Sequence, residues 1–95
     1  MIKSFANKST ESIFHGIHTH GLRKEFSSNL IKAAERKLDL LNCAESLESM
    51  RLIPSMKGEA AVRDAHGTYS IPIDKEWRIS FRWNNDVEDV EIKNW

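Results

Sequence analysis

Residues 67–83 have the sequence Gly67-Thr-Tyr-Ser-Ile-Pro-Ile-Asp-Lys-Glu-Trp-Arg-Ile-Ser-Phe-Arg-Trp83, which predicts two strands joined by a short polar turn. Successive side chains of a strand point to opposite faces of a sheet, so the alternation in the second strand predicts one buried face and one exposed face. The buried face would hold Trp77, Ile79, Phe81 and Trp83, and the exposed face Arg78, Ser80 and Arg82. This hairpin decides the fold, because an apolar sheet face has to be covered by another layer.

The two arginines of the second strand, Arg78 and Arg82, are predicted to lie on the same uncovered face. Arginine stays charged and its planar fork matches the oxygens of a phosphate, so such a face suits a polyanion. An acidic segment of a partner protein would fit equally well. The formal net charge of the chain is zero, and residues 58–95 hold more acidic than basic side chains. Any contact with RNA would therefore depend on a local patch and not on the overall field of the protein.

The first half of the chain predicts mainly helices. A strand at residues 1–8 and a loop at 16–21 flank a short helix that Ser9 or Thr10 would cap. The pattern at residues 22–44 predicts one long helix with a single apolar stripe. That stripe consists of Phe26, Leu30, Ala34, Leu38 and Leu41.

Two further strands complete the expected sheet, a short one near residues 61–63 and a final one at 87–95. The final strand would turn Lys93 and Trp95 toward the same open face as the arginines. The predicted architecture is α+β, with N-terminal helices packed on one face of a small antiparallel-rich β-sheet and the other face partly open. A chain of 95 residues is expected to form a single domain, residues 1–95.

The cysteine content and the apolar runs bear on the cellular compartment. The lone Cys43 excludes an intramolecular disulfide, and its apolar neighbours favour a small core residue over a nucleophile. No stretch approaches the roughly 20 apolar residues of a membrane span, and the N-terminus has no apolar signal-peptide core. We therefore expect a cytoplasmic protein.

The hairpin also resembles a known family. Its segments Tyr69-Ser70-Ile71 and Trp77-Arg78-Ile79-Ser80-Phe81 are similar to the signature hairpin of the RelE/ParE toxin superfamily, in its HigB-like branch. The segments at residues 1–5, 34–38 and 90–92 resemble the first strand, the long helix and the last strand of that branch. The resemblance implies a RelE-like fold in a type II toxin–antitoxin toxin, an mRNA interferase that cuts mRNA on the ribosome without metal or cofactor. It also implies a HigA-like antitoxin with a helix-turn-helix fold. The toxin would contact operator DNA only through this antitoxin.

The same resemblance suggests site residues. Metal-independent RNA cleavage needs a base, an acid, and cations for the charge that develops on the phosphate. Arg78 stands at the arginine position of the family, and Lys57 resembles a loop lysine of some relatives. Candidate catalytic residues are Arg78, His66 and Arg63, and candidate substrate-binding residues are Arg82, Lys57 and Trp95. His66 and Arg63 precede the hairpin, where the family places basic and acid–base groups, and an ordinary imidazole titrates near the required pH.

The chain departs from the family pattern at three positions. HigB-like chains often end in Asp-Tyr-His, but here Asn94 stands at the acidic position and Trp95 at the tyrosine position. Pro72 falls where a basic residue is common. Asparagine cannot act as a base, and tryptophan can stack on a nucleobase but cannot transfer a phenolic proton. Two alternatives therefore stay open: a catalytically weak homologue acting as an antitoxin-binding module, and a gyrase-directed toxin of the ParE type.

Overall fold

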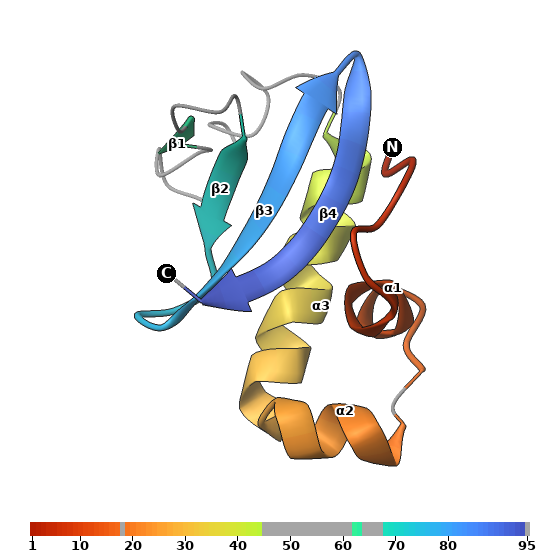
Figure 1. The fold of residues 1–95 in the computed structure, drawn as a ribbon, viewed down its shortest axis with the longest axis vertical. Coiled ribbons are helices and arrows are strands. Elements are labelled where there is room, and N and C mark those ends of the chain that lie inside the picture. Colours follow the sequence, from red (N-terminus) through yellow and green to blue (C-terminus); the bar gives the residue numbers. More distant parts are fainter. Residues whose placement is uncertain (18, 45–61, 64–67, 95) are drawn as a thin grey trace.

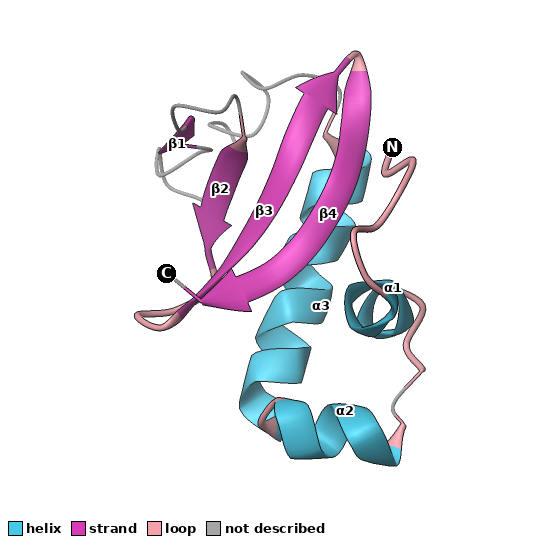
Figure 2. Ribbon diagram, in the orientation of Figure 1, coloured by secondary structure: helices cyan, strands magenta, loops and turns pink. Residues whose placement is uncertain are grey.

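The computed structural model describes residues 1–17, 19–44, 62–63 and 68–94. Its helices are α1 (Lys8–Phe14), α2 (His20–Glu25) and α3 (Ser28–Cys43), and its strands are β1 (Val62–Arg63), β2 (Tyr69–Pro72), β3 (Trp77–Asn84) and β4 (Asp86–Asn94). The strands form one antiparallel sheet in the order β1-β2-β3-β4. The helices lie together on one side of this sheet (Figures 1 and 2), which confirms the predicted α+β architecture.

The predicted hairpin is formed by β2 and β3. Ile71 pairs with Ile79 and Pro72 with Arg78 across the two strands. The turn between them is closed by Asp74, whose Oδ1 accepts hydrogen bonds from the backbone N–H groups of Glu76 and Trp77, both at 2.8 Å. A short aspartate side chain stabilises a turn in this way, because it satisfies backbone donors that the strands cannot reach.

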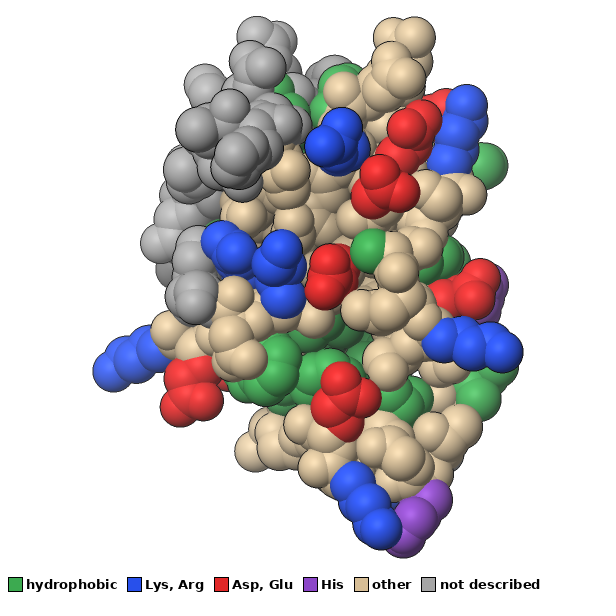
Figure 3. Space-filling model, viewed as in Figure 1, with side chains coloured by type: hydrophobic (Ala, Val, Ile, Leu, Met, Phe, Trp, Pro, Cys, Tyr) green, Lys and Arg blue, Asp and Glu red, His purple; other side chains and the backbone are tan. Residues whose placement is uncertain are grey.

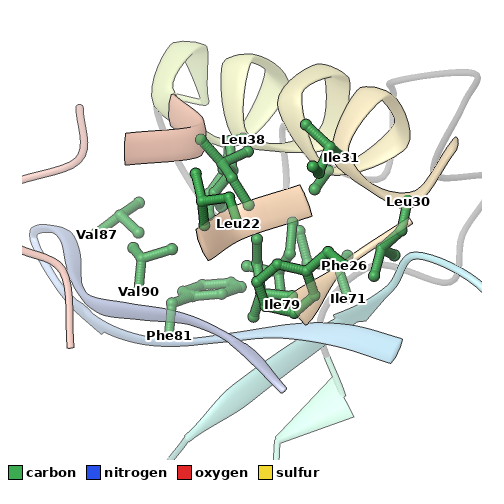
Figure 4. Packing of buried hydrophobic residues seen from close by; sticks show 14 of the residues in the cluster. Leu22, Phe26, Leu30, Ile31, Leu38, Ile71, Ile79, Phe81, Val87 and Val90 are labelled. Atoms are coloured by element: carbon green, nitrogen blue, oxygen red, sulfur yellow. The ribbon is translucent and has the colours of Figure 1, made fainter. Parts of the chain in front are cut away.

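The alternation along β3 separates an apolar from a polar face as expected, but Ser80, predicted to be exposed, is buried. Ile79 and Phe81 are fully buried, and Trp77 is partly buried with its ring edge-on to Phe26, the centroids 5.0 Å apart. Arg82 on the other face is exposed. The helices therefore cover the apolar face of the sheet, and Figure 4 shows the core side chains meeting between the two layers.

The predicted long helix is wrong in one respect, because the chain breaks at Phe26 and Ser27. Phe26 adopts an extended conformation and is buried, and the Ser27 side chain accepts a hydrogen bond from the Leu30 N–H at 3.1 Å to begin α3. Serine favours this N-cap position since its oxygen satisfies a free backbone donor. The apolar stripe itself is confirmed, since all of its members are buried. Within the described residues, no helix has the length and apolar character that crossing a membrane requires.

Three smaller predictions about the helices are also wrong. The cap of α1 is Asn7, whose Oδ1 accepts from the Thr10 N–H at 2.9 Å, and neither Ser9 nor Thr10 has that role. Gly21 lies inside α2 and not at the end of a loop. Cys43 is exposed in the last turn of α3, because a position two residues from the buried Leu41 points away from the core side of a helix.

The N-terminal segment runs beside β4, but it does not form the regular strand expected at residues 1–8. Its pairing with β4 is limited to isolated parallel bridges, Ile2 to Val87 and Phe5 to Val90, supported by backbone hydrogen bonds such as Lys3 N–H to the Val87 carbonyl at 2.7 Å. In its pairing with β3, strand β4 has one extra residue near Asp89, which has a φ of 52° and whose N–H donates to the Ser4 hydroxyl at 2.9 Å. This extra residue lets Val87 and Val90 both enter the core. The segment also covers an edge strand that would otherwise expose unpaired backbone groups.

Candidate functional site

A shallow hollow lies on the sheet face that the helices leave uncovered. Its volume is about 270 Å³. Figure 3 views the molecule from this side, and Lys, Arg, Asp and Glu side chains gather over the strands there. The lining residues are Ala6, Thr68, Arg78, Ser80, Arg82, Asp89, Glu91 and Lys93. The hollow is therefore a polar, charged surface, unlike the apolar cavities that hold most small ligands.

Strand β3 contributes alternate side chains to this hollow. Arg78 is partly buried, with its Nε atom fully enclosed, and Ser80 is buried between the two arginines. Arg82 is exposed, and its Nε lies 4.0 Å from Oδ2 of Asp89. An exposed pair at this distance contributes little stability, so it positions Arg82 only weakly.

Strand β4 places a second row of charges beside the first. Lys93 is directly opposite Arg78, Glu91 is opposite Ser80, and Glu88 is opposite Arg82. The face is therefore asymmetric along the strands. Basic side chains meet at the end where β3 begins and β4 ends, and carboxylates predominate toward the β3–β4 turn. An anion would approach most favourably at the first of these ends.

The structure brings together two of the predicted site residues, Arg78 and Arg82, in the same hollow. Arg63 lies in β1, paired with Tyr69, so it belongs to a strand and not to the expected loop. The short strand predicted near residues 61–63 is thereby confirmed. His66, Lys57 and Trp95 lie outside the residues that the structure describes. Their proposed roles stay predictions.

Lys93 and Glu91 were not among the predicted site residues, although both line the hollow. Alternation alone placed Lys93 on the open face, but the register between β3 and β4 is needed to see that it stands opposite Arg78. Glu91 likewise alternates onto the open face, and it lines the hollow. Lysine and glutamate are ordinary residues near the end of a strand, so their type does not mark them as site residues. Only their pairing with β3 does.

Asn94, at the family's acidic position, has a structural contact. Its Nδ2 donates a hydrogen bond to the backbone carbonyl of Glu76 at 3.3 Å, and it pairs with Trp77 across the sheet. Being next to Lys93 in the strand, it points to the opposite face from Arg78. Its amide therefore joins the end of β4 to the β2–β3 turn.

A small antiparallel sheet with helices on one face and arginines on the open face is the arrangement expected of a RelE-like α+β fold. The model of the family described as "RelE-like toxin of type II toxin-antitoxin system HigB" matches residues 3–94, and the chain therefore belongs to this family. Toxin HigB-1 of Vibrio cholerae serotype O1 is 28% identical over 87 residues, covering 92% of this chain and 88% of that protein.

An uncharacterized protein of Haemophilus influenzae is 31% identical over 66 residues. That match covers 68% of this chain and 65% of the Haemophilus protein, slightly less than two thirds of its length. The matched region of the family model includes all four strands and all three helices of the described structure. The recognition of a HigB-like toxin from the hairpin is thus confirmed.

Proposed function

We propose that this protein is an endoribonuclease that cleaves mRNA on the ribosome and so inhibits translation. The observation that carries the proposal is the hollow on the open sheet face, where Arg78 and Arg82 point away from the core in a HigB-like chain. A preorganised guanidinium can stabilise the charge that develops on a phosphate during transfer. A chain of zero net charge could not attract mRNA strongly over a long range, but the ribosome would hold the mRNA close to the bound toxin.

The reaction proposed for this site needs no group beyond the protein and the RNA. The 2′-hydroxyl of one nucleotide loses a proton to a base and attacks the adjacent phosphorus. The bond to the 5′-oxygen of the next nucleotide breaks, and an acid protonates that oxygen, which leaves a 2′,3′-cyclic phosphate and a 5′-hydroxyl. Arg78 would neutralise the phosphate oxygens in the transition state, and Arg63 would assist it. His66 is the proposed acid–base group, since an imidazole can accept and return a proton near neutral pH.

The proposed partners follow from the same family membership. An antitoxin with a helix-turn-helix fold would bind the toxin, and the antitoxin would make the contacts of the complex with operator DNA. The toxin alone would bind duplex DNA weakly, because its net charge is zero. Ribosome and mRNA are the other partners, and we place the protein in the cytoplasm, where these are found.

A second candidate function is an antitoxin-binding module that has lost cleavage. Asn94 favours it, because this residue replaces the family's acidic group and its side-chain amide is bonded to the backbone of the β2–β3 turn. Pro72, which pairs with Arg78 across the hairpin, favours it too, since it brings no cation to the site. A module of this kind would still bind the antitoxin and support repression of the operon.

Inducible expression of the chain, with and without its neighbouring gene, distinguishes the two functions. Growth arrest with new mRNA ends, mapped by primer extension and relieved by the neighbouring gene, would support the endoribonuclease. Arg78→Ala should abolish both effects, and Lys75→Ala, a change in the exposed β2–β3 turn, should abolish neither. Absence of new ends in cells that contain the folded protein would reject cleavage and favour the binding module.

A further inference from the structure

Arg78 and Lys93 are directly opposite one another on β3 and β4, and both line the hollow on the open face. Directly opposed residues of an antiparallel pair have Cβ atoms about 4.5–5.5 Å apart, and like charges in this relationship destabilise a sheet. Both side chains are partly buried, so water screens their repulsion less than at a fully exposed site. The pair is therefore a local cost to stability.

Two carboxylates, those of Asp89 and Glu91, also line the hollow. The Asp89 carboxylate lies 4.0 Å from Nε of the exposed Arg82, so it belongs to the Arg82 end of the hollow. Glu91, diagonal to Arg78 across the sheet, is the other carboxylate among the described residues that line the hollow. Among the described residues that line the hollow, the Arg78 end is thus net positive.

We propose that Lys93 is a substrate-binding residue that forms, with Arg78, a two-cation clamp for one phosphate of an RNA backbone. The proposal rests on the proposed function, because RNA is the ligand that the function supplies. A phosphodiester carries one negative charge on two non-bridging oxygens. The planar fork of Arg78 suits these oxygens, and the Lys93 ammonium adds a flexible point charge from the opposite strand.

The clamp predicts two effects of opposite sign when the lysine charge is removed. Lys93→Met keeps most of the apolar stem but removes the repulsion, so the free protein should become more stable. The same change should weaken binding of an anion. A lysine whose role is only structural would give either a loss of stability or no change, without a loss of binding.

The test uses the purified chain and a short single-stranded RNA whose 2′-hydroxyls are methylated, so that no 2′-oxygen can attack the phosphorus and cleave the RNA. Affinity is measured as a function of salt for the wild type, Lys93→Met and the control Lys75→Met, which changes net charge equally but lies in the turn. We expect Lys93→Met to weaken binding about tenfold and to reduce the slope of log K against log salt by about 0.7, the value for one phosphate contact. Lys75→Met should bind like the wild type.

Thermal unfolding with and without inorganic phosphate supplies the second readout. Phosphate should raise the midpoint of the wild type more than that of Lys93→Met, whose midpoint without phosphate should be the higher of the two. Lys93→Met that binds the RNA like the wild type would overturn the clamp, as would a wild type without measurable affinity for the RNA. Binding also separates the clamp from the proposed function: a wild type that binds through Lys93 but yields no cleavage on ribosomes would reject the function alone.

Discussion

The hydroxyl oxygen of Thr10 in α1 accepts a hydrogen bond from the backbone N–H of Ile92 in β4, at 3.0 Å, and both residues are buried. This bond joins the first helix to the outer strand of the sheet, 82 residues away in sequence. It satisfies a backbone donor that neither water nor a neighbouring strand reaches, and such donors are rarely left unpaired. The bond therefore helps to fix the strand that carries Lys93, one residue further along.

Thr10→Val tests this bond, because valine keeps the shape of threonine but cannot accept a hydrogen bond. We expect a loss of about 1–3 kcal/mol in the free energy of unfolding, the cost of leaving the Ile92 N–H unsatisfied. Urea denaturation followed by circular dichroism measures this loss. Thr10→Ser, which keeps the hydroxyl, is the control and should lose less. A Thr10→Val protein as stable as the wild type would show that the bond contributes nothing.

Replacing Arg78 should remove toxicity without unfolding the protein, since its side chain faces away from the helices. We expect Arg78→Ala to fold with an unchanged circular dichroism spectrum and to permit growth when it is expressed. Arg78→Lys should restore only part of the toxicity, because an ammonium cannot reproduce a bidentate guanidinium contact. Full toxicity of a folded Arg78→Ala protein would remove this residue from the mechanism.

Core packing predicts a clear order of stability losses along β3. Phe81 is fully buried, so Phe81→Ala should cost about 3–5 kcal/mol. Trp77 is only partly buried against Phe26, so Trp77→Ala should cost less, even though tryptophan is larger. Denaturant midpoints of the two variants compare these costs directly. The reverse order would mean that the indole of Trp77, and not Phe81, is the main contact between sheet and helices.

The turn between β3 and β4 depends on a residue that tolerates a positive φ. Asn85 has a φ of 63° and is exposed, so a substitution there changes backbone strain with little loss of packing. Asn85→Gly should leave the stability unchanged or slightly raised, whereas Asn85→Val should reduce it by about 1–2 kcal/mol. Comparing the thermal unfolding midpoints of the two variants tests the positive φ at Asn85. Equal stability of the two variants would contradict the turn geometry.

Much of the fold could be predicted because local patterns determine it. The alternation at residues 77–83 separated the core face from the open face, and the helical stripe identified the residues of α3 that pack on the sheet. The break at Phe26 was missed because apolar spacing continues across it, although Ser27 is a strong capping residue. The extra residue at Asp89 was missed because it depends on the register between β3 and β4, and its N–H donates to Ser4 in the distant N-terminal segment.

The candidate site could be predicted only in part, for a related reason. Alternation placed Arg78 and Arg82 on the open face, and the structure brings both to one hollow. The opposition of Arg78 and Lys93 depends on the register between strands, which no pattern within one strand reveals. Cys43 shows the same limit for helices, since apolar neighbours in sequence did not place it in the core.

Cleavage of a defined mRNA in a reconstituted system tests the central proposal most directly. Purified ribosomes carrying that mRNA would be incubated with the wild type or with Arg78→Ala, and the mRNA ends mapped by primer extension. We expect the wild type to cut ribosome-bound mRNA, to leave free mRNA intact, and to lose this activity in Arg78→Ala. Intact mRNA on ribosomes saturated with folded wild-type protein would contradict the proposed endoribonuclease.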